Sequence, residues 1–225
     1  MSYGNELTNV GEKQLFNESC NLFNQILDDL KRKSLLRTIF IQMDVDRLRK
    51  IWENSRFFGT AFNRMVDVFR SPEKAANLAE KANMTPNIFG YIFFTQLAGN
   101  ALYDYEAVLK TSFLFFIEEE ATGNNTKGFR KNMSLGKLFF RLKEISPIYG
   151  QALYEIIDID LRNSLAHGTF WFDSSKVYLA KNSYLDDVMV LPLDKFWKKT
   201  RRINIISHAF IEILMEKIKS NYFKA

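Results

Sequence analysis

Apolar side chains recur at the spacing of α-helices through most of this chain. Near its start, Leu15, Leu22, Ile26 and Leu30 lie four or seven positions apart, which places them on one face of a helix. The same kind of pattern predicts helices over residues 5–34, 44–69, 73–82, 86–120, 135–144, 146–167 and 195–220.

Capping residues support several of these helix boundaries. A hydroxyl side chain can cap the first turn of a helix, and proline is favoured at the first helical position. Three such pairs precede predicted helices, Ser71-Pro72, Thr85-Pro86 and Ser146-Pro147. Gly168 follows the helix predicted over 146–167, where a glycine is typical of a helix end.

Two short runs have the alternation of β-strands instead. They span 176–180 and 188–191, with a loop over 182–187 and a terminating proline at Pro192. These runs predict one small β-hairpin inserted before the last helix.

Composition favours helices over an all-β architecture. The 225 residues include only 10 Gly and 4 Pro, whereas sandwiches and barrels need many turns. Hydrophobic residues make up 47% and charged residues 25%, which is typical of a globular protein. We therefore expect an all-α protein with a minor hairpin, divided near 71–86 into a helical accessory region (1–85) and a second region (86–225).

The number of cysteines and the least charged segment of the chain indicate the cellular compartment and whether a membrane is a partner. A lone Cys20 can form no disulfide within the chain, which favours a reducing, cytoplasmic setting. Residues 82–103 carry no charge, but Asn83, Gln96 and Asn100 would be costly in lipid. We therefore expect a buried core helix there and no membrane partner.

The chain is mildly basic, with a formal net charge of +5, which permits an anionic partner such as RNA. Basic residues cluster beside aromatic residues in two segments, as in grooves that follow a phosphate backbone. We expect RNA contacts from Lys137, Arg141, Lys198, Lys199, Arg201 and Arg202. A solvated basic face is the alternative interpretation of each cluster.

Only two histidines are present, so each can be weighed. His208 lies within the last predicted helix, and we expect it at the edge of the packed stripe. His167 closes a polar segment near the end of another predicted helix. At about 100° per residue, Asp160, Asn163 and His167 form a polar line along that helix, with Arg162 about 140° round from His167.

This set of side chains suits phosphodiester chemistry. An imidazole can take or give a proton near neutral pH, a guanidinium can hold a phosphate through two hydrogen bonds, and an amide can orient either group. The alternative is a solvated Arg162 and a His167 that caps the helix. The sequence has no G-x-S-x-G elbow, glycine-rich phosphate loop or zinc-ligand spacing, so we expect neither a cofactor nor a metal.

The segment Arg162-Asn163-Ser164-Leu165-Ala166-His167-Gly168 resembles the R-N-x-x-x-H signature of HEPN domains (higher eukaryotes and prokaryotes nucleotide-binding). The resemblance covers about 86–225, where a long helix, a short helix, the motif helix, a β-patterned insert and a closing helix follow one another. It implies a HEPN-like helical bundle and a metal-independent endoribonuclease of toxin–antitoxin or antiviral-defence systems. By position, Arg162 and His167 would be catalytic, with Asn163 beside them. Glu106 or Asp104 would supply the acidic residue that some members carry on the long helix. Asp160, in the polar line of the motif helix, is a further candidate for a supporting acidic residue.

The resemblance also implies a homodimer in which two motifs share one cleft, and an antitoxin protein as a further partner. Cleavage by 2′-OH attack works best with both a base and an acid, which independently favours two copies of His167 in one site. The alternative functions are a non-catalytic HEPN module that binds a nucleotide or a protein, and a helical interaction protein in which Arg162 and His167 are incidental.

Overall fold

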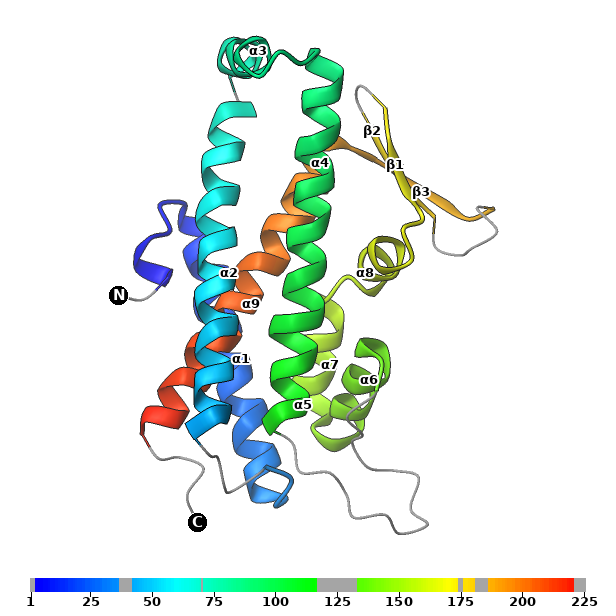
Figure 1. The fold of residues 1–225 in the computed structure, drawn as a ribbon. Coiled ribbons are helices and arrows are strands. Elements are labelled where there is room, and N and C mark those ends of the chain that lie inside the picture. The colour runs from blue at the N-terminus through cyan, green and yellow to red at the C-terminus, as the bar shows by residue number, and fades with distance from the viewer. Residues whose placement is uncertain are drawn as a thin grey trace. The chain divides into compact units, whose positions relative to one another are not determined.

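The computed structural model describes residues 3–36, 42–69, 71–116, 133–173, 176–180 and 186–220. Of these residues, 78% are helical and 8% are in strands, which confirms a mainly helical protein. The elements, drawn in Figure 1, are a 3₁₀ turn Tyr3–Asn5, α1 Val10–Arg32, α2 Gln42–Phe69, α3 Pro72–Lys81, α4 Pro86–Tyr103, a π-helical stretch Asp104–Thr111, α5 Ser112–Phe116, α6 Leu135–Ile145, α7 Pro147–Ile156, α8 Ile159–Ala166, β1 Phe170–Phe172, β2 Lys176–Ala180, β3 Val188–Pro192 and α9 Leu193–Lys219.

The chain forms two compact units, and each draws on segments from both sides of residue 85. Unit 1 comprises residues 1–55, 104–158 and 205–225, and unit 2 comprises residues 56–103 and 159–204. The division into a helical accessory region (1–85) and a HEPN-like domain (86–225) stays a prediction.

Aromatic side chains fill the core of unit 1. Phe23, Phe113, Phe139 and Phe210 are all fully buried. The rings of Phe113 and Phe210 stack with centroids 4.1 Å apart, and those of Phe23 and Phe210 lie 4.7 Å apart. Burying a phenylalanine contributes roughly 1.5–3 kcal/mol, so these residues from α1, α5, α6 and α9 hold the unit together.

Within unit 1, α6 and α7 cross at very close range. A Cβ added to Gly150 of α7 would lie 2.4 Å from the backbone oxygen of Leu142 in α6. Only glycine allows this approach, so Gly150 fixes how the two helices pack.

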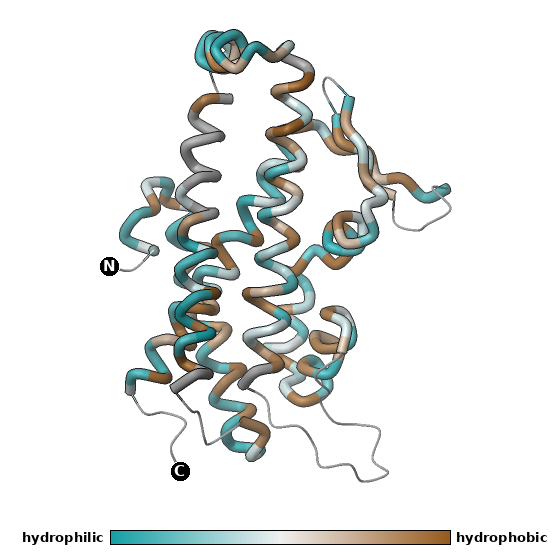
Figure 2. The backbone as a smooth tube through the Cα atoms, in the orientation of Figure 1, coloured by the Kyte–Doolittle hydropathy of each residue, from teal (hydrophilic) through white to brown (hydrophobic). Residues whose placement is uncertain are grey.

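Unit 2 contains the sheet. Its strand order is β1-β2-β3 and both pairings are antiparallel, with Phe172 opposite Val177 and Val177 opposite Leu191. On the inner face, the Phe172 ring lies 5.3 Å from that of Phe94 on α4 and 6.1 Å from that of Phe196 on α9. In Figure 2 hydrophobic residues recur along the strands.

Several expected boundaries change in the structure. The helix predicted over 146–167 is broken, because α7 ends at Ile156 and α8 begins at Ile159. The hairpin is confirmed, but a third strand, β1, was not predicted. The helix predicted over 86–120 includes the π-helical stretch, and its last residues, like the loop predicted at 123–128, lie outside the described residues.

Candidate phosphodiester site

The motif helix α8 is short and firmly anchored in unit 2. Leu161 and Leu165 are buried on its inner side. The buried hydroxyl of Ser164 donates a 2.8 Å hydrogen bond to the carbonyl oxygen of Ala180 at the end of β2. Thr169 binds the same residue twice, through its hydroxyl to the Ala180 oxygen (2.9 Å) and through its carbonyl to the Ala180 N–H (2.8 Å). The helix and the turn that follows it are therefore fixed to the sheet.

The C-terminal end of α8 adopts a Schellman motif. Gly168 has φ +64°, which is the left-handed region that glycine adopts without strain. The Thr169 N–H donates to the Ser164 carbonyl (3.0 Å) and the Gly168 N–H to the Leu165 carbonyl (3.3 Å), as this motif requires. The predicted glycine stop is confirmed.

His167 is exposed at this helix end. Its backbone N–H still bonds to the Asn163 carbonyl (3.0 Å), so the residue continues the last turn of the helix. Its imidazole therefore lies at the surface, on backbone that the Schellman motif and Thr169 hold in place.

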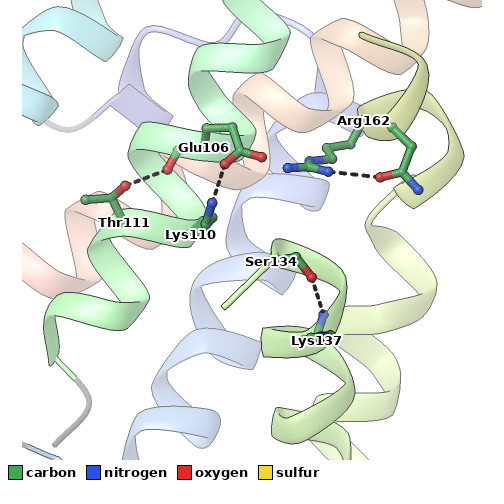
Figure 3. Close-up of polar contacts among 7 residues, drawn as sticks. Glu106, Lys110, Thr111, Ser134, Lys137 and Arg162 are labelled. Carbon is green, nitrogen blue, oxygen red and sulfur yellow. Dashed lines mark hydrogen bonds and ion pairs between the residues drawn. The ribbon is translucent and has the colours of Figure 1, made fainter. Parts of the chain in front are cut away.

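Arg162 and Asn163 are brought into direct contact. The Arg162 Nη1 donates a 3.0 Å hydrogen bond to the Asn163 Oδ1, as the dashed line from Arg162 in Figure 3 shows. Both residues are half-buried. Asp160 is exposed in the first turn of α8, where the helix dipole favours a carboxylate. The polar line expected from the sequence is thus formed by an exposed Asp160, a half-buried Asn163 and an exposed His167.

The basic residues of α9 are divided by burial. Lys198 and Arg202 are exposed, and Lys198 forms a 3.4 Å ion pair with Asp194. Arg201, expected among the RNA-facing cations, is only 6% exposed, and its guanidinium donates to the Asn204 Oδ1 at 3.2 Å. The expectation that Arg201 faces solvent is therefore wrong, because its side chain lies on the packed side of α9.

The remaining candidate residues belong to unit 1. Lys137 is exposed in the first turn of α6, which the Ser134 hydroxyl caps (Figure 3). Arg141 pairs with Glu144 at 2.8 Å. Glu106 is half-buried in the π-helical stretch, and its carboxylate pairs with Lys110 at 2.8 Å (Figure 3). Glu106 is therefore an ion-paired residue within its own unit.

The second histidine lies in a buried polar cluster of unit 1. His208, expected at the edge of a packed stripe, is fully buried, and the Tyr3 ring stacks on it at 3.9 Å. Its Nε2 lies 3.4 Å from the Ser55 hydroxyl, which also lies 3.3 Å from the Asp104 carboxylate. No local pattern could have revealed this cluster, since its members come from four separate segments. Because this cluster is buried, its side chains cannot contact a substrate.

Cys20 is a half-buried thiol of unit 1. Burial, together with the nearby carboxylates of Glu212 and Glu216, raises the pKa of Cys20 to about 12. The thiol therefore stays protonated at neutral pH, which fits a packing residue and not a nucleophile.

Among the described residues, no three His, Cys, Asp or Glu side chains are grouped so that they could hold a metal ion. No helix in the described part of the chain is both long and apolar enough to cross a bilayer. The chain has no match among family models, curated proteins or solved structures.

Proposed function

We propose that this protein is a metal-independent endoribonuclease of the HEPN type, with Arg162, Asn163 and His167 as its catalytic residues. One observation carries the proposal: an exposed imidazole follows a hydrogen-bonded Arg–Asn pair on a helix whose end is fixed to a sheet. Groups held on rigid elements keep the geometry that proton transfer needs.

The reaction follows from the chemistry of these groups. His167 accepts the proton of a ribose 2′-OH, whose oxygen attacks the adjacent phosphorus. The bond from phosphorus to the 5′-oxygen breaks, and that oxygen receives a proton from an imidazolium. Arg162 stabilises the charge that develops on the phosphorane oxygens, and Asn163 orients the guanidinium. The products carry a 2′,3′-cyclic phosphate and a 5′-hydroxyl.

A homodimer completes this mechanism. The chain has two histidines, and His208 is fully buried, so one copy offers a single accessible imidazole. Two copies of His167 across a two-fold axis would supply the base and the acid together. Light scattering tests this directly: a monomer with full activity would refute the shared site.

Exposed cations assist by holding the phosphate backbone. Lys198 and Arg202 are exposed in unit 2, the unit of His167, and we assign them this role together with Lys199. We leave Arg201 out because it is buried. We further propose that the nuclease is a toxin or antiviral-defence effector restrained by an antitoxin protein, as the resemblance to HEPN domains implies, and that it acts in the cytoplasm, which the lone Cys20 favours.

The test is cleavage of single-stranded RNA in EDTA by purified wild type and three variants. Arg162→Ala and His167→Ala should each abolish cleavage while the circular dichroism spectrum is unchanged. The control is Arg49→Ala, which removes an exposed arginine from α2 and should retain activity. Equal activity in wild type and His167→Ala would refute the catalytic assignment.

Expression in cells separates the nuclease from a non-catalytic binding module. Toxicity of the wild type that either substitution relieves supports the nuclease. Wild type and variants that are tolerated equally, with no RNA cleaved in vitro, would instead favour a module that binds nucleotides or proteins.

A further inference from the structure

The outer face of the sheet in unit 2 carries a row of three side chains, of which two are exposed and the middle one is half-buried. Trp171 lies opposite Tyr178, and Tyr178 lies opposite Val190, so the three occupy one line across β1, β2 and β3. Trp171 is 40% and Val190 47% exposed, whereas Val177 and Leu179 on the inner face are buried. We call Trp171, Tyr178 and Val190 the outer row.

Two members of the outer row form a rigid aromatic stack. The rings of Trp171 and Tyr178 are nearly parallel, with an interplanar angle of 3° and centroids 5.2 Å apart. The Tyr178 hydroxyl donates a 2.6 Å hydrogen bond to the Asp173 carboxylate, which also accepts from the Lys176 N–H at 2.8 Å. This hydrogen bond raises the pKa of Tyr178, so the phenol remains protonated and held.

Trp171 keeps 40% of its surface exposed beside the Tyr178 ring, so the indole is accessible to a ligand. The Tyr178 ring stacks on the indole, and among the described strands β1 lies at the edge of the sheet. Lys176, exposed on the same side of the sheet as Tyr178, offers a positive charge beside the stack. A flat ring next to a cation suits a nucleobase and its phosphate.

The stack lies close to His167 along the chain. Three residues separate His167 from Trp171, so their Cα atoms are at most about 14 Å apart. Thr169 anchors this connection to Ala180. A single strand stacked at about 3.4 Å per nucleotide spans that distance with about four nucleotides.

We propose that Trp171, backed by Tyr178, stacks against an unpaired base of single-stranded RNA a few nucleotides from the phosphate cleaved at His167. This inference rests on the proposed ribonuclease function and names its substrate as unpaired RNA. Duplex RNA would not use the stack, because its bases are already paired and covered.

Binding of a fluorescein-labelled 2′-O-methyl oligouridine tests the stack in the full-length protein. This RNA cannot be cleaved, because its 2′-oxygens are blocked, so binding is measured independently of catalysis. Trp171→Ala should raise Kd about fivefold or more, the range found when a stacking aromatic is removed. Trp171→Phe, which keeps a flat ring, should raise Kd less. The control Phe57→Ala removes a 69% exposed aromatic residue from α2 in the same unit and should leave Kd unchanged.

The outcomes separate this inference from the proposed function. If wild type, Trp171→Phe and Trp171→Ala bound the RNA with equal Kd values, the proposed stacking of a base on Trp171 would be wrong, even if His167→Ala still abolished cleavage. Duplex RNA bound as tightly as the oligouridine would also overturn it. Loss of binding in Trp171→Ala, together with cleavage that persists in His167→Ala, would leave the stack standing and refute the catalytic site. If the full-length protein bound no RNA at all and cleaved none, both the stack and the proposed function would be overturned.

Discussion

The helix end that presents His167 depends on the left-handed backbone of Gly168, and Gly168→Ala tests this dependence. A Cβ at this position would meet no atom within 4 Å, so the substitution causes no clash. Its cost is backbone strain alone, about 1–2 kcal/mol for an L-residue at φ +64°. Alanine also lowers the conformational entropy of the unfolded chain relative to glycine, and this effect offsets about 0.4–1 kcal/mol of the strain. The free energy of unfolding should therefore fall, by up to about 1.6 kcal/mol.

Gly99→Ala is a matched control for the same chemical change. Gly99 lies inside α4 in the same unit, its added Cβ also has open space, and its backbone is helical. Alanine is favoured over glycine within a helix by roughly 0.5–1 kcal/mol, so this variant should be more stable than wild type. The two alanine substitutions should thus have opposite signs in urea unfolding followed by circular dichroism.

Two further measurements complete this test. Gly168→Asn should lose less stability than Gly168→Ala, because asparagine tolerates the left-handed region better. Cleavage by Gly168→Ala should fall by more than its loss of folded protein, since His167 directly precedes the strained residue. If Gly168→Ala stabilised the protein as much as Gly99→Ala, the left-handed conformation at residue 168 would not be required, and the predicted backbone strain would be refuted.

Three other predictions concern packing and a thiol. Gly150→Ala forces a Cβ to within 2.4 Å of the Leu142 oxygen and should cost about 3 kcal/mol in urea unfolding; a neutral effect would contradict the close crossing. Ser164→Ala removes a buried hydrogen bond to Ala180 and should cost about 1 kcal/mol, with unchanged stability the contrary result. Cys20 should react with iodoacetamide at pH 8 roughly a thousandfold more slowly in the folded protein than in urea, since its pKa rises from 9.0 to about 12; equal rates would show an accessible thiolate.

Local signals predicted the helix starts well. Ser71 accepts a hydrogen bond from the Lys74 N–H, and Thr85 accepts one from the Ile88 N–H, as their positions before proline suggested. Ser146 behaves differently, since its hydroxyl binds the Asp29 carboxylate of α1 instead of its own helix. A helix cap is a contact between residues a few positions apart, so the sequence can predict it. The sequence cannot predict that a distant side chain, such as the Asp29 carboxylate, competes for the capping hydroxyl.

The break between α7 and α8 shows the same limit. The apolar positions Leu153, Ile157 and Leu161 continue at helical spacing, so the sequence favours one helix. In the structure Ile157 is extended, and the carbonyl of Asp158 accepts a hydrogen bond from the Tyr105 hydroxyl at 3.1 Å. That tertiary contact satisfies a carbonyl at the break, and a residue 53 positions away supplies it.

The candidate site was predictable where it depends on spacing within one helix. The contact of Arg162 with Asn163 and the exposed helix end at His167 follow from neighbouring positions and from Gly168. The burial of Arg201 depends on what covers α9, which no local pattern specifies. The strand β1 has only three residues, too few to show alternation, so its pairing with β2 and the stack of Trp171 became visible only in the fold.

The chemistry assigned to His167 and Arg162 is tested most directly with an RNA that carries a single 2′-deoxynucleotide on the 5′ side of the cleaved phosphate. With the unmodified RNA in EDTA, wild type should produce a 2′,3′-cyclic phosphate, and with the modified RNA cleavage at that phosphate should disappear while other positions are still cut. Cleavage that continues at the modified position, or products that end in a 3′-hydroxyl, would contradict attack by the 2′-oxygen and with it the proposed site.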